Sequence, residues 1–183
     1  MHKLNNLLFS TSQQKILSFL VEDFAEYTEK EISKNTDVKK SAVNLALHDL
    51  VACGLIQKRK IGRTALLRAD FRNNAVKEIK IIKNILEVQP LVEKIKKESL
   101  KIILFGSFAS GLNSRESDID LFVLSNNGIA IRGKINNSAF AERVQLILKT
   151  PSEMLKINKN KPLLFQEIEK GRVLWEINED QGI

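Results

Sequence analysis

The stretch KIILFGSFASGLNSRESDIDLFVLS constrains the fold more than any other part of the chain. The run from Leu100 to Phe105 is almost entirely apolar, which is typical of a strand buried on both faces. The small residues Gly106 and Ser107 follow it, and ten residues later Asp118-Ile-Asp opens a second apolar run. The pattern predicts two strands joined through a small-residue turn and a short helix.

Side chains alternate along a strand, so Asp118 and Asp120 are expected on one face while Ile119 and Leu121 enter the core. Two carboxylates about 7 Å apart repel each other unless a cation lies between them. We therefore predict that Asp118 and Asp120 bind Mg²⁺ or Mn²⁺. An exposed pair of aspartates at a strand start, without any ligand, is the alternative.

Gly106 and Ser107 suit a phosphate site, because small side chains let phosphate oxygens reach backbone amides and the seryl hydroxyl. A bound cation would bridge the triphosphate of ATP or another NTP and hold an attacking hydroxyl. The chemistry expected of such a site is metal-assisted nucleotidyl transfer.

Gly-Ser, a spacer of ten and Asp-x-Asp resemble the signature of the minimal nucleotidyltransferases in the DNA polymerase beta superfamily. The resemblance covers about residues 98–177. It implies that Gly106 and Ser107 contact the triphosphate and that Asp118 and Asp120 are the catalytic metal ligands. It also implies transfer from NTP to a hydroxyl acceptor, which in this family can belong to a protein such as a toxin partner.

The chain departs from that family where a third carboxylate is expected. The candidate strand AERVQLILKT offers Gln145 at the position between apolar neighbours, and an amide cannot accept the proton of an attacking hydroxyl. Glu142 lies three residues earlier, on the opposite face unless a bulge intervenes. Catalysis and nucleotide binding without catalysis therefore both stay open.

The first seventy residues have a different pattern. Ser12 can cap a helix that runs to Phe24, and Thr28 with Glu31 forms a capping box before a second helix. A third helix begins near residue 39 and ends before Gly54, and two short strands surround Gly62. Its expected apolar face consists of Val43, Leu47, Leu50 and Val51.

Three helices and a basic hairpin resemble a winged helix-turn-helix domain, in which the third helix enters the major groove and the hairpin touches the DNA backbone. The resemblance implies DNA-facing residues on the third helix: Lys39, Lys40, Ser41, Asn44 and His48. It implies phosphate contacts from the hairpin by Lys58, Arg59, Lys60 and Arg63. The alternative is a solvated surface on a dimerisation or docking domain.

The segment between these parts has apolar residues at helical spacing, interrupted at Pro90, and predicts two helices. They fit either a homodimer contact or packing on the catalytic sheet. The expected organisation is thus α+β: a winged helix-turn-helix domain over 1–70, a helical connector over 71–97 and a small mixed-sheet nucleotidyltransferase-like domain over 98–183.

Three further expectations concern single segments. Cys53 lies among apolar residues, which predicts a buried thiol. The polar stretch SNNGIAIRGKINNS predicts a loop over the site, in which solvated charges are the favoured account of Arg132 and Lys134. Trp175 in the last strand is predicted to be a core residue.

The charge and the residue composition of the chain limit the kinds of partner that we expect. The formal charge is +7, and the first hundred residues hold 18 basic against 12 acidic side chains, which favours an anionic partner bound there. A single cysteine excludes an intramolecular disulfide, and the absence of a long apolar stretch or signal-like start favours the cytoplasm and no membrane contact. Two hypotheses remain: a DNA-binding nucleotidyltransferase, and a transcriptional regulator whose degenerate catalytic domain binds nucleotide or mediates assembly.

Overall fold

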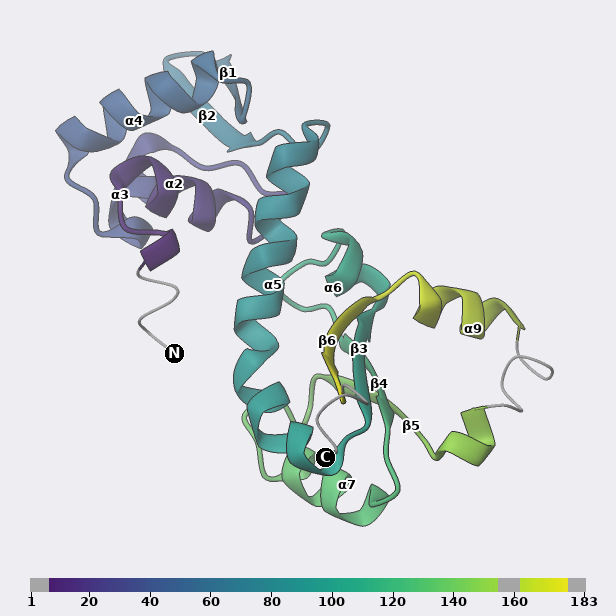
Figure 1. The fold of residues 1–183 in the computed structure, drawn as a ribbon. Coiled ribbons are helices and arrows are strands. Elements are labelled where there is room, and N and C mark those ends of the chain that lie inside the picture. Colours follow the sequence, from purple (N-terminus) through teal and green to yellow (C-terminus); the bar gives the residue numbers. More distant parts are fainter. Residues whose placement is uncertain (1–6, 155–161, 178–183) are drawn as a thin grey trace. The chain divides into compact units, whose positions relative to one another are not determined.

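The computed structural model describes residues 7–154 and 162–177 of the 183-residue chain (Figure 1). The chain divides into two units, Met1–Lys83 and Asn84–Ile183, each with its own core. Among the described residues, no helix is both long and apolar enough to cross a bilayer.

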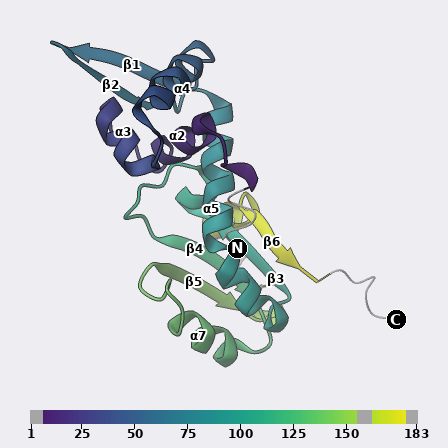
Figure 2. The same ribbon diagram turned by 90° about the vertical axis from the view of Figure 1, so that its left-hand side faces the viewer.

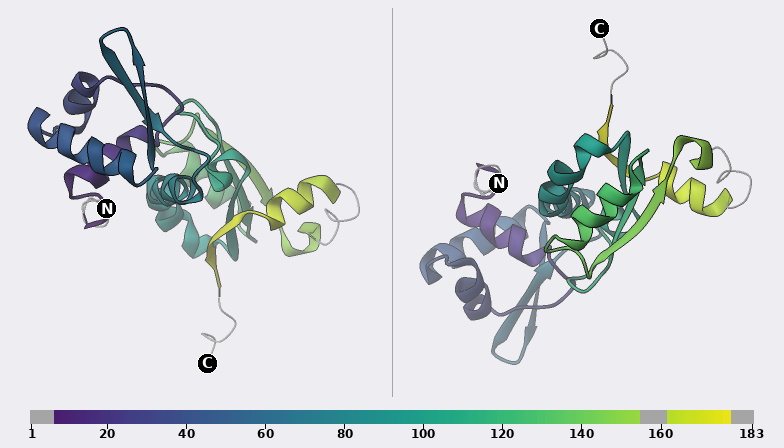
Figure 3. Two further views of the ribbon diagram at one scale, coloured as in Figure 1. Left: turned by 90° about the horizontal axis from the view of Figure 1, so that it is seen from above. Right: turned by 90° about the horizontal axis from the view of Figure 1, so that it is seen from below.

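Between residues 12 and 69 the first unit has three helices followed by a two-stranded antiparallel hairpin, and it also includes the start of the next helix. The hairpin extends away from the three helices in Figures 2 and 3. Thr28 caps the second helix in the expected capping box with Glu31, whereas the first helix is capped by Thr11 instead of Ser12. The elements are α2 (Ser12–Leu20), α3 (Glu29–Thr36), α4 (Lys40–Ala52), β1 (Ile56–Ile61) and β2 (Thr64–Ala69).

Helix α4 buries Val43, Leu47 and Leu50 as expected, but not Val51. Ala46 is buried instead, because it lies between these residues on the helix face while Val51 has turned toward solvent. The prediction of a buried Cys53 was also wrong: the helix ends at Ala52, and Cys53 is exposed at its C-cap.

Helix α2 ends at Leu20, four residues before the predicted end at Phe24. The buried ammonium of Lys80 donates hydrogen bonds to the carbonyls of Val21 (2.7 Å) and Glu22 (3.0 Å), just after the helix. It also lies 5.6 Å from the ring centroid of Phe24, which packs against Phe71. A cation at the carbonyl end of a helix is favourable, so a tertiary contact fixes this helix end.

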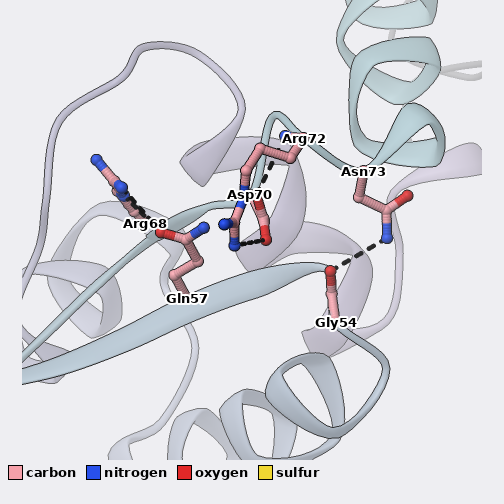
Figure 4. A network of polar contacts seen from close by, with 6 residues as sticks. All are labelled: Gly54, Gln57, Arg68, Asp70, Arg72 and Asn73. Atoms are coloured by element: carbon pink, nitrogen blue, oxygen red, sulfur yellow. Dashed lines mark hydrogen bonds and ion pairs between the residues drawn. The ribbon is translucent and has the colours of Figure 1, made fainter.

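Polar contacts fix the passage from the hairpin to the next helix (Figure 4). Asn73 donates to the carbonyl of Gly54 (3.1 Å), and Arg68 donates to the side-chain oxygen of Gln57. The guanidinium of Arg72, with help from Gln57, holds the pKa of Asp70 well below its usual range. These contacts join both ends of the hairpin to the start of the helix that follows.

The connector is one helix, α5 (Asn74–Ile95), and not the two helices that Pro90 predicted. Proline removes one backbone donor and strains an interior turn. Here Val88, Leu91, Val92 and Ile95 are all buried in the core of the second unit, so packing on both sides of Pro90 offsets that cost. A one-turn 3₁₀ helix, η1 (Lys96–Glu98), ends the segment.

The second unit contains a four-stranded mixed sheet in the order β5-β4-β3-β6 (Figure 2). Strands β4 and β5 are parallel, and the other neighbours are antiparallel. This confirms the expected α+β class with a mixed sheet. The strands are β3 (Lys101–Phe105), β4 (Ile119–Leu124), β5 (Val144–Lys149) and β6 (Arg172–Glu176).

The two faces of this sheet have separate cores. One face packs on the second half of α5 and on α7 (Gly128–Asn136). The other face, with Ile103, Phe105 and Phe122, packs on Ile168 of α9 (Pro162–Glu169). Figure 1 shows α5 and α9 on opposite sides of the sheet.

Helix α7 occupies the stretch that was predicted as a loop over the site. Asn127 caps it, and Ile131 and Ile135 are buried against the sheet, so the helix is amphipathic despite its polar composition. Lys134 pairs with Glu98. Trp175 is half-buried, and its indole donates to the carbonyl of Ser99 (3.3 Å), in agreement with a core role.

Candidate functional site

Gly106 follows the last residue of β3 and begins the short helix α6 (Gly106–Ser110). Figure 1 shows α6 directly after β3. Its φ angle is +67°, a conformation that side chains with a Cβ rarely adopt. A Cβ added there would lie 2.2 Å from Oδ2 of Asp120. Glycine is therefore required both by the backbone and by the carboxylate next to it.

Ser107 is half-buried in the first turn of α6. Within the described part of the chain, its hydroxyl forms no hydrogen bond. It is therefore available to a ligand.

Asp118 and Asp120 lie on either side of the start of β4. Ile119 and Leu121 are fully buried, whereas Asp118 is exposed and Asp120 half-buried, so the alternation along the strand is as predicted. Asp120 is paired in register with Phe105, directly before Gly106. The fold thus brings the four motif residues together at one end of the sheet.

Gln145 occupies the neighbouring strand, in register with Asp120, and its amide donates to Oδ2 of Asp118 (3.4 Å). The structure thus places an amide side chain on the strand next to the two aspartates. Glu142 lies in the turn before β5 and makes no hydrogen bond or ion pair with any described residue. The strand supplies no carboxylate to this site.

The electrostatics of Asp120 reveal a residue that sequence reasoning missed. Partial burial raises the pKa of Asp120 above its ordinary value, and the charges of Asp118 and then Glu167 raise it further. Glu167 belongs to α9, and no local sequence pattern indicates which part of the sheet this helix meets. Only the tertiary structure brings its charge near the motif.

Asp118 and Asp120 fit a divalent cation, because the raised pKa of Asp120 means that a positive ligand beside it would be favourable. Asp118 and Asp120 are the residues that would hold it. Among residues 7–154 and 162–177, however, no three acidic, histidine or cysteine side chains lie close enough to share one ion.

A buried amide pair holds the spacer between Ser107 and Asp118. Asn84 donates to the carbonyl of Phe108 in α6 and to the side-chain oxygen of Asn113, both at 2.8 Å, and each asparagine is only 4% exposed. Ser114 and Ser117 close the following turn, through a 2.9 Å bond from the amide of Ser114 to the hydroxyl of Ser117.

The raised pKa of Asp120 makes a prediction about stability without metal. Folding disfavours the ionised carboxyl, so the wild type loses stability as the pH rises above 3.8 through the folded-state pKa. We expect Asp120→Asn to raise the melting temperature by a few degrees at about pH 7 in chelator, and the gain to vanish at about pH 3.5. Glu169→Gln, an exposed carboxylate on α9, is the control; a pH-independent gain for Asp120→Asn would contradict the electrostatic cause.

The residues expected to face DNA lie on the surface of the first unit. All five on or next to α4 are exposed, and Lys39 is the N-cap residue of that helix: Lys39, Lys40, Ser41, Asn44 and His48. The structure brings these exposed side chains to one helix.

The cations of the hairpin fall into two groups. Arg59 forms a two-bond ion pair with Glu26, with Nε 2.6 Å from Oε1, and Lys58 lies 3.6 Å from Glu29. Lys60 and Arg63 are exposed near the tip and form no ion pair with the described residues. Phosphate contacts by the first group would have to compete with internal carboxylates.

Comparison with known proteins identifies the second unit. The family model described as polymerase beta, nucleotidyltransferase matches residues 80–180, more than half of the chain. No curated protein matches the chain.

Two solved structures are similar over part of the chain. A toxin-antitoxin structure with AMP-PNP shares 25% identity over 53% of this chain and 77% of its own, with a TM-score of 0.34. A mutant of the toxin-antitoxin MntA-HpeT shares 22% identity over 52% of this chain and 76% of its own, also with a TM-score of 0.34.

Proposed function

The chain belongs to the polymerase beta nucleotidyltransferase family, and on this premise we propose that its second unit transfers a nucleotidyl group from an NTP to a hydroxyl acceptor. The observation that supports the proposal is the close approach of Gly106 to the carboxylate of Asp120, which joins the Gly-Ser turn and the Asp-x-Asp pair in one site. ATP with Mg²⁺ or Mn²⁺ is the substrate that we propose to test first.

Each residue of the motif has a proposed part in the reaction. The absence of a side chain at Gly106 and the free hydroxyl of Ser107 admit the triphosphate, and Asp118 and Asp120 hold the cation. When bound, the cation polarises phosphate oxygens and neutralises the developing charge. The acceptor oxygen forms a bond to the α-phosphorus, the bond from that phosphorus to the bridging oxygen breaks, and pyrophosphate leaves.

Transfer is tested with α-labelled ATP, Mg²⁺ or Mn²⁺, and a panel of hydroxyl acceptors that includes nucleic acid ends and protein partners of the toxin type. The expected product is a labelled acceptor that does not form in chelator. Metal-dependent nucleotide binding without transfer to any acceptor would replace this proposal by the alternative, a non-catalytic regulator, which Gln145 favours.

For the first unit we propose a winged helix-turn-helix that binds DNA. Three helices and a hairpin, the exposed polar side chains of α4 and the basic hairpin tip support this assignment. A surface used for dimerisation or docking is the alternative.

The two groups of hairpin cations make the DNA proposal specific. Because Lys60 and Arg63 pair with no carboxylate of the described residues, Lys60→Ala with Arg63→Ala is expected to reduce the slope of log affinity against log salt by about 2. The measurement is DNA binding at a series of salt concentrations.

The charge-matched control is Lys15→Ala with Lys77→Ala, on neither α4 nor the hairpin. Equal effects of the two double variants would mean that only net charge matters, and the hairpin assignment would be wrong.

A further inference from the structure

We propose that Glu167 on α9 is a catalytic residue that receives the proton of the acceptor hydroxyl, in place of the strand carboxylate that Gln145 replaces. This inference rests on the proposed transfer reaction. It assigns the proton-accepting role to a helix on the sheet face instead of to β5.

The sheet register brings the end of α9 to the motif. Arg172, three residues after this helix, is in register with Leu104 on β3, and Asp120 is in register with Phe105, the next residue of β3. Figure 1 shows the chain passing from α9 into β6 beside the end of β3 from which α6 starts. Strands β4 and β6 both pair with β3. The C-terminal turn of α9, just before β6, and Asp120 on β4 therefore lie at the same end of the sheet.

Gly171 allows the chain between α9 and β6 to pack closely against β3. A Cβ on Gly171 would lie 2.6 Å from the carbonyl oxygen of Leu104 and 2.6 Å from Cγ2 of Ile103. The chain after α9 thus contacts the last residues of β3, and this contact fixes the position of the helix end.

The packing of α9 decides which side of the sheet it covers. Ile168 is fully buried against Phe105 and Phe122, and Leu164 packs on the same cluster. Phe122 follows Asp120 by two residues on β4, so both point to this face. Glu167 precedes Ile168 at the edge of the buried stripe, and it is exposed.

Glu167 is also available to a ligand, because its exposed side chain forms no ion pair or hydrogen bond with any described residue. Since the described residues contain no three-ligand metal cluster, we place it on the acceptor side of the site and not in the coordination shell.

With this assignment, every bond and the proton of the transfer step are accounted for. As the acceptor oxygen bonds to the α-phosphorus and pyrophosphate departs, the hydroxyl proton passes to a carboxylate oxygen of Glu167. Gln145 cannot take it, because a neutral amide has no basic oxygen of that strength.

The test compares Glu167→Gln with Glu169→Gln, an exposed glutamate on the same helix. We expect the first to lower kcat by about 10² to 10⁴-fold with the metal-dependent affinity for ATP unchanged, and the second to have no effect. A second variant separates catalysis from structure: Gln145→Asp added to Glu167→Gln returns a carboxylate to the strand and is expected to restore transfer.

The outcomes distinguish this inference from the function on which it rests. Transfer by the wild type together with full activity of Glu167→Gln overturns the role of Glu167 alone. An inactive Glu167→Gln that Gln145→Asp does not rescue also overturns it. Absence of transfer by the wild type, with every acceptor, overturns both.

Discussion

A double variant with Asp118→Asn and Asp120→Asn is expected to lower kcat/KM for nucleotidyl transfer by at least about 10³-fold. Asp120 lies beside Gly106, Asp118 precedes it by two residues, and the neighbouring strand β5 has no carboxylate that could replace either one. Asparagine keeps the shape of each side chain but removes the negative charge that binds a divalent cation. The measurement is transfer from labelled ATP, with metal-dependent ATP binding measured in parallel.

The matched control removes two other carboxylates from the same unit, by Glu116→Gln with Glu142→Gln. Both side chains are exposed, and the change in net charge is identical. If the control loses as much activity as the aspartate variant, the cation site is not where we place it. If Glu142 alone proves essential, the strand supplies a carboxylate that its position in the turn does not indicate.

The second large effect is expected from a single methyl group at Gly106. Gly106→Ala forces a Cβ to within 2.2 Å of the Asp120 carboxylate and requires a φ near +67°. The strained backbone and the displaced carboxylate together are expected to destabilise the unit by about 1–3 kcal/mol. We also expect metal-dependent ATP binding to be lost at temperatures where the variant is still folded, as checked by thermal unfolding and calorimetry.

Gly133→Ala is the control, because a Cβ at that position of α7 meets nothing within 4 Å. It should leave ATP binding intact and stabilise the helix slightly, by up to about 1 kcal/mol. Normal ATP binding by Gly106→Ala would show that the turn tolerates a side chain, contrary to the contact with Asp120.

Local patterns predicted much of this site. The alternation at Asp118 and Asp120, the turn at Gly106 and the position of Gln145 all follow from periodicity within a few residues. Whether an apolar segment meets a sheet face depends on partners far along the chain. The continuation of α5 through Pro90, the helix α7 and the approach of Glu167 to Asp120 all depend on such partners, and the sequence pattern missed them.

The ion pairs of the hairpin also could not be predicted from the local sequence. The sequence groups Lys58, Arg59, Lys60 and Arg63 as one basic cluster, but the fold separates them by pairing only the first two with Glu26 and Glu29. Composition cannot reveal this difference, because the partner carboxylates lie about thirty residues earlier in the chain.

The buried pair of Asn84 and Asn113 explains why the number of residues between Ser107 and Asp118 matters for the site. The ten residues between Ser107 and Asp118 contain the rest of α6, an anchor at Asn113 and a turn closed by Ser114 and Ser117. The buried asparagine pair and the serine turn fix the path of this spacer at two points, so its length sets the separation of the Gly106 turn from the two aspartates. A search for related sequences is therefore better based on the interval and its anchoring amide together than on the four motif residues alone.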